Sequence, residues 1–298
     1  MNAEKELAKQ NSFKIVGDLV EVNLENKTSG RTGKDFISGK IVIKSLIDGR
    51  QQLTEVELYS NKFKQDGTGN KLFDTYANLG ALLNKRVRVS GELGESRFFS
   101  TQNSQLVSTV VNRGRYVAAA DTGEKDTTDF SFAGYIVKPL YEKNSKDGQL
   151  VAYEMLVAQA NWNNTKPNLV KFTVAKENKT AVTAIQRLYE KGMTVSVRGN
   201  ISIINEDVEV SEKTAFGEST RVYHNTYKNY LIQTGSQPLD KGAYSPQDIL
   251  ELTRAYDDDG IAIQNAAKGQ ATTGKTTTGG KTTTAAPAPA KTPRTSLL

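Results

Sequence analysis

The chain contains one set of β-type segments twice, and this internal repeat constrains its fold more than any other feature. Phe13–Val20 and Phe130–Val137 both place a glycine four residues after a leading phenylalanine, and the two glycines lie 117 positions apart. Val87–Gly91 and Val195–Gly199 form a second matching pair, 108 positions apart. The nine-residue difference requires only a change in loop length, which surface connections tolerate at little entropic cost. A repeat of this length is a whole small domain rather than a solenoid unit.

Both copies show the same order of predicted elements: three strands, a helix and two further strands. In the first copy the strands are expected near 13–24, 36–47, 51–60, 86–91 and 105–117, with a helix over 71–85. In the second they are expected near 130–137, 150–160, 169–175, 193–199 and 221–233, with a helix over 180–191. Apolar alternation, an Asp-Gly turn and leucines at helical spacing carry these predictions. The order is that of the OB-fold, a five-stranded Greek-key barrel that binds oligonucleotides or oligosaccharides. The sequence thus predicts a mainly β protein with two tandem OB-fold-like five-stranded barrels, each with one helix.

The remaining segments are short or compositionally biased. A helix is expected to start at Ser245-Pro246 and to run through Tyr256, because serine caps helices and proline suits their first position. The last residues are mostly Thr, Gly, Ala, Pro and Lys, which bury too little apolar surface to offset the entropy of ordering. The predicted organisation is an N-terminal extension over 1–10, barrel one over 11–120, a linker over 121–129, barrel two over 130–240, a helical segment over 241–260 and a disordered basic tail over 261–298.

Composition excludes most enzyme chemistry. The chain has no cysteine and a single histidine, His224, which removes disulfides, thiolate zinc sites and cysteine nucleophiles. His224 lies beside Tyr223 on a predicted strand and is read as structural. We therefore expect a protein that is not an enzyme and that uses no cofactor and no metal. A carboxylate-only enzyme, such as a metal-dependent nuclease or a glycosidase, is a rival that would need a convergent acidic cluster.

No apolar run approaches the roughly 20 residues that span a bilayer, and the polar first ten residues do not resemble a secretory signal. A cytoplasmic protein without a membrane partner is expected.

The charge is unevenly distributed. Residues 1–120 carry 18 Lys and Arg against 13 Asp and Glu, which is net +5, whereas residues 121–235 carry 14 of each. Residues 260–298 hold four lysines, one arginine and no acid, which is again net +5. This distribution favours a polyanionic partner.

Strand alternation separates core from surface and indicates which side chains could contact such a partner. In Arg86–Val89 the valines are expected inside the barrel and the arginines outside. Trp162 stands in a polar hairpin loop, where an apolar ring suits base stacking or, alternatively, packing over the open barrel end. Single-stranded nucleic acid needs this mixture of cations for phosphates and aromatic rings for bases. The candidate residues for binding single-stranded DNA are Lys40, Lys44, Tyr59, Arg86, Arg88, Arg97, Phe98, Phe99, Trp162, Lys171, Arg198, Arg221, Tyr223 and Tyr227.

The element order and the segment Arg-Val-Arg-Val-Ser-Gly-Glu-Leu at 86–93 resemble the OB-fold of single-stranded DNA-binding proteins over about residues 11–235. Two such modules with a flexible tail are most similar to the phage-encoded type, which implies residence in the cytoplasm of a bacterial host. Bacterial members typically carry one module, tetramerise and end in an acidic tip with a terminal aromatic. Here Lys291–Leu298 is basic and has no aromatic residue, so recruitment of partners through the tip is not expected.

The resemblance implies a protein that coats and protects single-stranded DNA during replication or recombination, with little sequence preference. Its partners would be single-stranded DNA, with RNA left open, and replication or recombination proteins. The alternative is a virion structural or assembly protein built from two β-barrels, which would form a defined oligomer and bind nucleic acid weakly.

Overall fold

The computed structural model describes residues 8–145, 147–161, 165–214 and 217–273, and within these ranges it describes only the backbone of 205–214, 217–226 and 269–273. Trp162 and the tail from residue 274 onward lie outside the described residues. The strands are β1 (Asn11–Thr28), β2 (Asp35–Ile47), β3 (Arg50–Asn61), β4 (Arg86–Ser100), β5 (Gln105–Ala119), β6 (Thr127–Asn144), β7 (Leu150–Ala160), β8 (Pro167–Ala175), β9 (Thr194–Thr214) and β10 (Gly217–Gly235). The helices are α2 (Lys71–Ala77), the 3-10 helix η1 (Leu79–Leu82), α3 (Lys179–Leu188) and α4 (Pro246–Thr273).

The strands close into two barrels of the same topology. In barrel one, β1 pairs with both β2 and β4, β2 pairs with β3, β4 pairs with β5, and a parallel pairing of β3 with β5 closes the ring. In barrel two, β6, β7, β8, β10 and β9 follow the same circuit, with β8 and β10 parallel. The predicted fold class, mainly β with five-stranded OB-like barrels, is confirmed.

Matching residues of the sequence repeat occupy matching registers. Phe13 pairs with Gly91 in barrel one, and Phe130 pairs with Gly199 in barrel two. Gly91 and Gly199 lie where neighbouring backbone leaves no room, because an added Cβ would meet a carbonyl oxygen at 2.0 Å and 1.8 Å respectively. Both barrels therefore use glycine at this point for close strand approach rather than for a turn.

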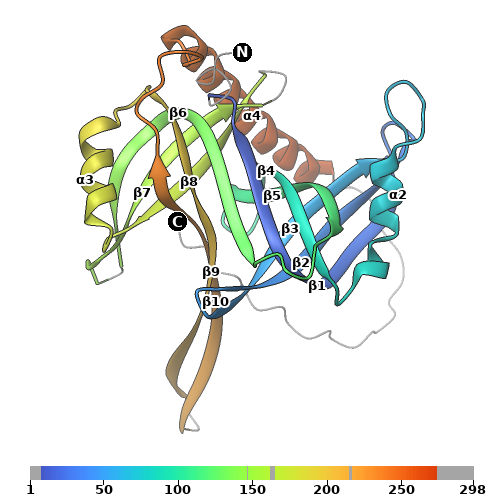
Figure 1. Ribbon diagram of the computed structural model, residues 1–298, viewed down its shortest axis with the longest axis horizontal. Coiled ribbons are helices and arrows are strands. Elements are labelled where there is room, and N and C mark those ends of the chain that lie inside the picture. Colours follow the sequence, from blue (N-terminus) through green and yellow to red (C-terminus); the bar gives the residue numbers. More distant parts are fainter. Residues whose placement is uncertain (1–7, 146, 162–164, 215–216, 274–298) are drawn as a thin grey trace.

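The two barrels are joined into one body. Residues 11–16 of β1 pair antiparallel with residues 127–132 of β6, so all ten strands form a continuous sheet. β6 thus begins inside the segment predicted as a linker over 121–129. One hydrophobic cluster runs through both barrels and contains Phe13, Phe130 and Phe172. Figure 1 shows the barrels side by side, with α2 beside barrel one and α3 beside barrel two.

Helix α4 lies across both barrels and is longer than predicted (Figure 1). Its start is as expected, since the Ser245 hydroxyl accepts a hydrogen bond from the Asp248 backbone N–H at 3.1 Å. It continues past Tyr256 to Thr273, and Gly260 within it allows close packing, because an added Cβ there would meet the Arg97 guanidinium at 2.6 Å. Leu252 packs with Tyr135 and Ala158 of barrel two.

Among the described residues, no helix combines the length and the apolar character needed to cross a membrane.

Candidate nucleic-acid interface

An aromatic and basic surface lies in barrel one, where strand β2 begins and strand β3 ends. Phe36 and Tyr59 project from neighbouring strands with ring centroids 5.5 Å apart, and the side chain of Tyr59 is 59% exposed. Phe63 is also exposed, with the Lys62 ammonium 5.8 Å from its ring centroid. Two rings open to solvent beside a cation can stack unpaired bases and contact phosphates. We call Phe36, Tyr59, Lys62 and Phe63 the Tyr59 patch.

Two of the predicted lysines, Lys40 and Lys44, lie on β2, the strand that also carries Phe36. Lys40 lies opposite Glu57, two residue pairs from the Tyr59 pair in the β2–β3 register, and its ammonium pairs with Glu55 at 2.8 Å. Lys44 lies farther along the same strand, 3.8 Å from the Asp18 carboxylate. Of the predicted residues, Lys40 and Tyr59 are thus brought together on one face.

Barrel two carries a comparable group on β6, β7 and β8, which correspond to β1, β2 and β3 of barrel one. The Lys138 ammonium stands 3.7 Å from the centroid of the Tyr141 ring, and Tyr141 donates a hydrogen bond to Glu154 at 3.0 Å. Lys143 and the predicted Lys171 form ion pairs with the same carboxylate at 3.2 Å and 3.4 Å. We call Lys138, Tyr141, Lys143, Glu154 and Lys171 the Tyr141 cluster.

The buried carboxylate of Glu154 is the common partner of Tyr141, Lys143 and Lys171. Burial alone would raise the pKa of its carboxyl, but Lys171 and Lys143 outweigh burial and lower it, so the carboxylate stays charged. Burial and the neighbouring carboxylate raise the pKa of Tyr141, which keeps its phenol protonated. The cluster therefore presents three lysines and one ring around a single compensating negative charge.

The predicted arginines of β4 point outward as expected, but acidic residues already contact them. Arg88 Nε donates to both carboxylate oxygens of Glu124, at 2.9 Å and 3.0 Å, and Arg86 forms an ion pair with Asp126. Both acids come from the connection between the barrels, more than thirty positions away in the chain. Sequence alternation predicted the outward direction and could not show these partners.

Arg97 does not lie on an open surface. Its side chain is 10% exposed, its guanidinium stands 3.7 Å from the Tyr256 ring centroid, and it pairs with Asp259 at 3.2 Å. Both partners belong to α4, so the prediction of a DNA contact at Arg97 gives way to a structural role beneath the helix.

Replacing Tyr256 with alanine is expected to loosen α4 from barrel one. The change removes the ring beside Arg97 and the hydroxyl that donates to buried Glu95 at 2.6 Å, at a cost of about 2–4 kcal/mol. Hydrogen exchange across Pro246–Thr273 should quicken, with Tyr256→Phe intermediate because it keeps the ring. Ile261→Ala, at an exposed position of the same helix, is the control. Unchanged exchange in Tyr256→Ala would contradict this role.

The other predicted residues are more scattered. Phe98 is exposed near the end of β4 and Phe99 is half-buried, while Arg198 on β9 is exposed and forms no salt bridge within the described part of the chain. Tyr227 is half-buried on β10. Arg221 and Tyr223 lie near the start of β10, opposite Val210 and Val208 of β9. This part of the two strands forms an arm that extends beyond the barrel (Figure 1), and the two side chains are not described.

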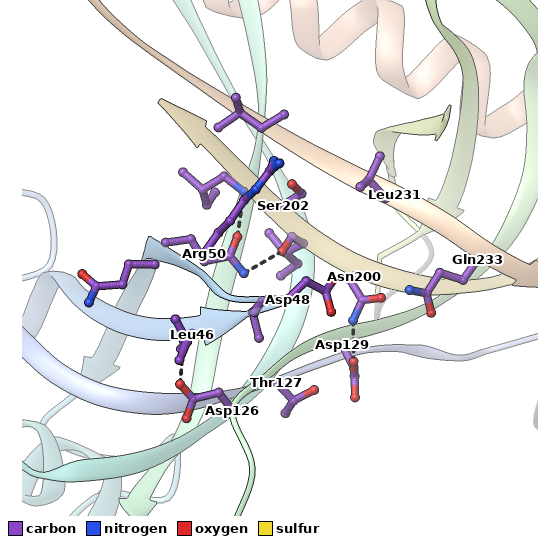
Figure 2. Close-up of a pocket in the computed structure, with 16 residues that line it drawn as sticks. Leu46, Asp48, Arg50, Asp126, Thr127, Asp129, Asn200, Ser202, Leu231 and Gln233 are labelled. Atoms are coloured by element: carbon purple, nitrogen blue, oxygen red, sulfur yellow. Dashed lines mark hydrogen bonds between the residues drawn. The ribbon is translucent and has the colours of Figure 1, made fainter. Parts of the chain in front are cut away.

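A cleft of about 890 Å³ separates the β2–β3 turn from strands β9 and β10. Figure 2 shows Asp126 reaching the backbone of Leu46 and Asn200 reaching Asp129 along its walls. Three aspartates and one arginine line it, so its charge does not suit a phosphate. No group of three or more potential metal ligands occurs among the described residues.

Comparison with known proteins places the chain in a family. The family model YorF matches residues 9–269. The chain belongs to the YorF family. No curated protein matches this YorF-family sequence.

Solved structures show more distant likenesses. Wild-type single-stranded DNA binding protein from Thermus aquaticus is 12% identical, with a TM-score of 0.47 over 79% of this chain and 96% of that one. A deletion mutant of the same protein is 12% identical, with a TM-score of 0.49 over 80% and 97%. The Plasmodium falciparum SSB complex with ssDNA is 13% identical, with a TM-score of 0.27 over 37% and 95%. At these values the similarities do not carry a function over to the YorF-family chain.

In this YorF-family protein, sequence reasoning missed part of the surface. Lys62 and Phe63 follow the end of β3 and join the Tyr59 patch only through the fold. Tyr141 and Lys143 lie beyond the strand expected near 130–137, in the second half of β6. The pairing of Tyr141 with Glu154 and of Lys143 with Ala152 of β7 was the missing information.

Proposed function

We propose that this chain binds and coats single-stranded DNA during replication or recombination, with little sequence preference. The observation that carries the proposal is the recurrence of one surface type: each barrel places an aromatic ring beside lysines on the outer face of its first three strands. Rings stack on any base, and cations neutralise any phosphate, so such a surface is sequence-tolerant.

The Tyr59 patch is the stronger stacking site because its rings are open to solvent. Tyr59 and Phe63 would stack bases while Lys40 and Lys62 contact phosphates. In the Tyr141 cluster, Lys138, Lys143 and Lys171 would contribute mainly charge. Because the barrels share a sheet and a core, a bound DNA strand would meet two sites whose spacing does not depend on a flexible linker. Linking two weak sites in this way can raise affinity by roughly 10²–10⁴-fold.

The salt dependence of binding tests this proposal. Five predicted cations of the outer surface, namely Lys40, Lys44, Arg86, Arg88 and Lys171, form ion pairs with carboxylates of the chain itself. When a phosphate displaces such a carboxylate, the freed carboxylate takes up a counterion, which offsets part of the release from the DNA.

Affinity for an oligonucleotide of thymidines should therefore fall with salt, but with a log–log slope of about −1 to −2 rather than the value of about −3.5 expected for five unpaired cations. Titrations at four salt concentrations measure the slope. A slope of zero would contradict phosphate contact, and a slope of about −3.5 would contradict the compensation by internal carboxylates.

A further inference from the structure

The connection between β5 and β6 folds back onto the outer face of barrel one. The backbone N–H of Ala120 donates to the Arg86 carbonyl at 3.1 Å, and that of Glu124 donates to the Asp121 carbonyl at 3.0 Å. This connecting segment, residues 120–126, thereby brings two carboxylates against strands β1 and β4. Hydrogen bonds with Arg86 and with the Leu46 backbone N–H hold it there.

Three cations from the two strands meet these carboxylates. Glu124 receives both hydrogen bonds of Arg88 Nε and forms a 2.8 Å ion pair with Lys14. Asp126 pairs with Arg86, whose guanidinium also donates to the Glu124 carbonyl at 3.1 Å. The hydrogen bonds from Arg88 and Lys14 lower the pKa of the Glu124 carboxyl to about 2, so this group is charged at neutral pH.

The arrangement has the form of a phosphate site. A planar guanidinium that donates to two oxygens, with an ammonium at hydrogen-bond distance, binds carboxylate and phosphate by the same geometry. The side chains of Lys14 and Arg88 are 48% and 42% exposed, whereas that of Glu124 is 16% exposed beneath them. A DNA strand could therefore reach the side chains of Lys14 and Arg88 without opening either barrel.

We infer that Lys14, Arg86 and Arg88 form a binding site for backbone phosphates of single-stranded DNA, and that Glu124 and Asp126 occupy this site in the free protein. The connecting segment is then an internal competitor: phosphate takes the place of the carboxylates, and residues 120–126 leave the barrel surface. This inference rests on the proposed function and adds to it a site and its regulation.

The test is Glu124→Gln, which keeps the size of the side chain and removes its charge. Affinity for a thymidine oligonucleotide at low salt should rise about 3–10-fold, and the log–log salt slope should become more negative by about 0.7–1.4. Glu92→Gln is the matched control: Glu92 lies on the same strand β4, pairs with Arg115 at 2.7 Å, and loses the same charge. It should change affinity by less than about twofold.

Combining Glu124→Gln with Arg88→Gln should remove the gain. Equal affinities for Glu124→Gln and wild type, or equal gains in Glu124→Gln and Glu92→Gln, would overturn the inference.

A second measurement uses the unaltered chain and so does not depend on the variant folding. Amide hydrogen exchange in residues 120–126 should quicken when the protein is saturated with the oligonucleotide, because the segment is released. Slower or unchanged exchange there would also overturn the inference. Failure of the proposed interface is distinguishable: Tyr59→Ala would then bind like wild type, whatever Glu124→Gln does.

Discussion

Replacing Tyr59 with alanine is expected to weaken binding of single-stranded DNA by about 5–150-fold. The ring is 59% exposed and lies 5.5 Å from Phe36, where an unpaired base can stack on it. Loss of one base–aromatic stack costs about 1–3 kcal/mol, which corresponds to that range. Fluorescence anisotropy of a labelled thymidine oligonucleotide measures the change. Thermal unfolding should be nearly unaffected, because an exposed ring contributes little to the core.

Tyr116→Ala provides the matched control for this experiment. Tyr116 is 64% exposed on β5 of the same barrel, and it lies outside the Tyr59 patch. The control should bind within about twofold of wild type. If both variants lose affinity equally, stacking is not localised at the patch, and if neither loses affinity, the patch is not part of the interface.

Replacing Gly134 with alanine is expected to destabilise the protein by about 3 kcal/mol or more. The added Cβ would meet the carbonyl oxygen of Ala158 at 2.2 Å, and backbone on a neighbouring strand cannot move aside as a side chain can. Gly17 has the equivalent position in barrel one, with the Lys44 carbonyl oxygen at 2.3 Å. Because the barrels share one core, the melting temperature should fall by about 6–12 °C in a single transition.

Gly30→Ala is the control for glycine replacement itself. Gly30 lies in the loop between β1 and β2, and a Cβ there would meet nothing within 4 Å. Its stability should stay within about 0.5 kcal/mol of wild type. A stable Gly134→Ala protein would mean that β6 and β7 do not approach as closely as described. Two separate unfolding transitions would mean that the shared core does not couple the barrels.

The fold could be predicted because local patterns and the repeat agree. Alternation predicted Val87 and Val89 inside the barrel and Arg86 and Arg88 outside, and both valines are fully buried. The paired glycines of the repeat marked corresponding strands, since close strand approach imposes the same residue in both barrels. Such information lies within a few neighbouring residues and needs no knowledge of distant contacts.

The surface was harder to predict because its chemistry depends on contacts between distant segments. Arg88 meets Glu124 across 36 positions, and Arg97 contacts Tyr256 across 159 positions. Nothing in the local pattern distinguishes an exposed cation from one that a remote carboxylate or helix covers. Gly260 shows the same limit: glycine commonly follows the end of a helix, whereas here the packing of α4 on Arg97 favours glycine inside the helix.

The most direct test of the central claim is a comparison of single-stranded and duplex DNA of the same sequence. Labelled oligonucleotides would be titrated with the full chain at low and moderate salt and followed by anisotropy. Tight binding of the single strand, at least tenfold weaker binding of the duplex and weakening by salt would support stacking with phosphate contact, because paired bases cannot stack on the Tyr59 patch. Equal affinity for both forms, or no binding to either, would contradict the account and favour a structural protein built from two barrels.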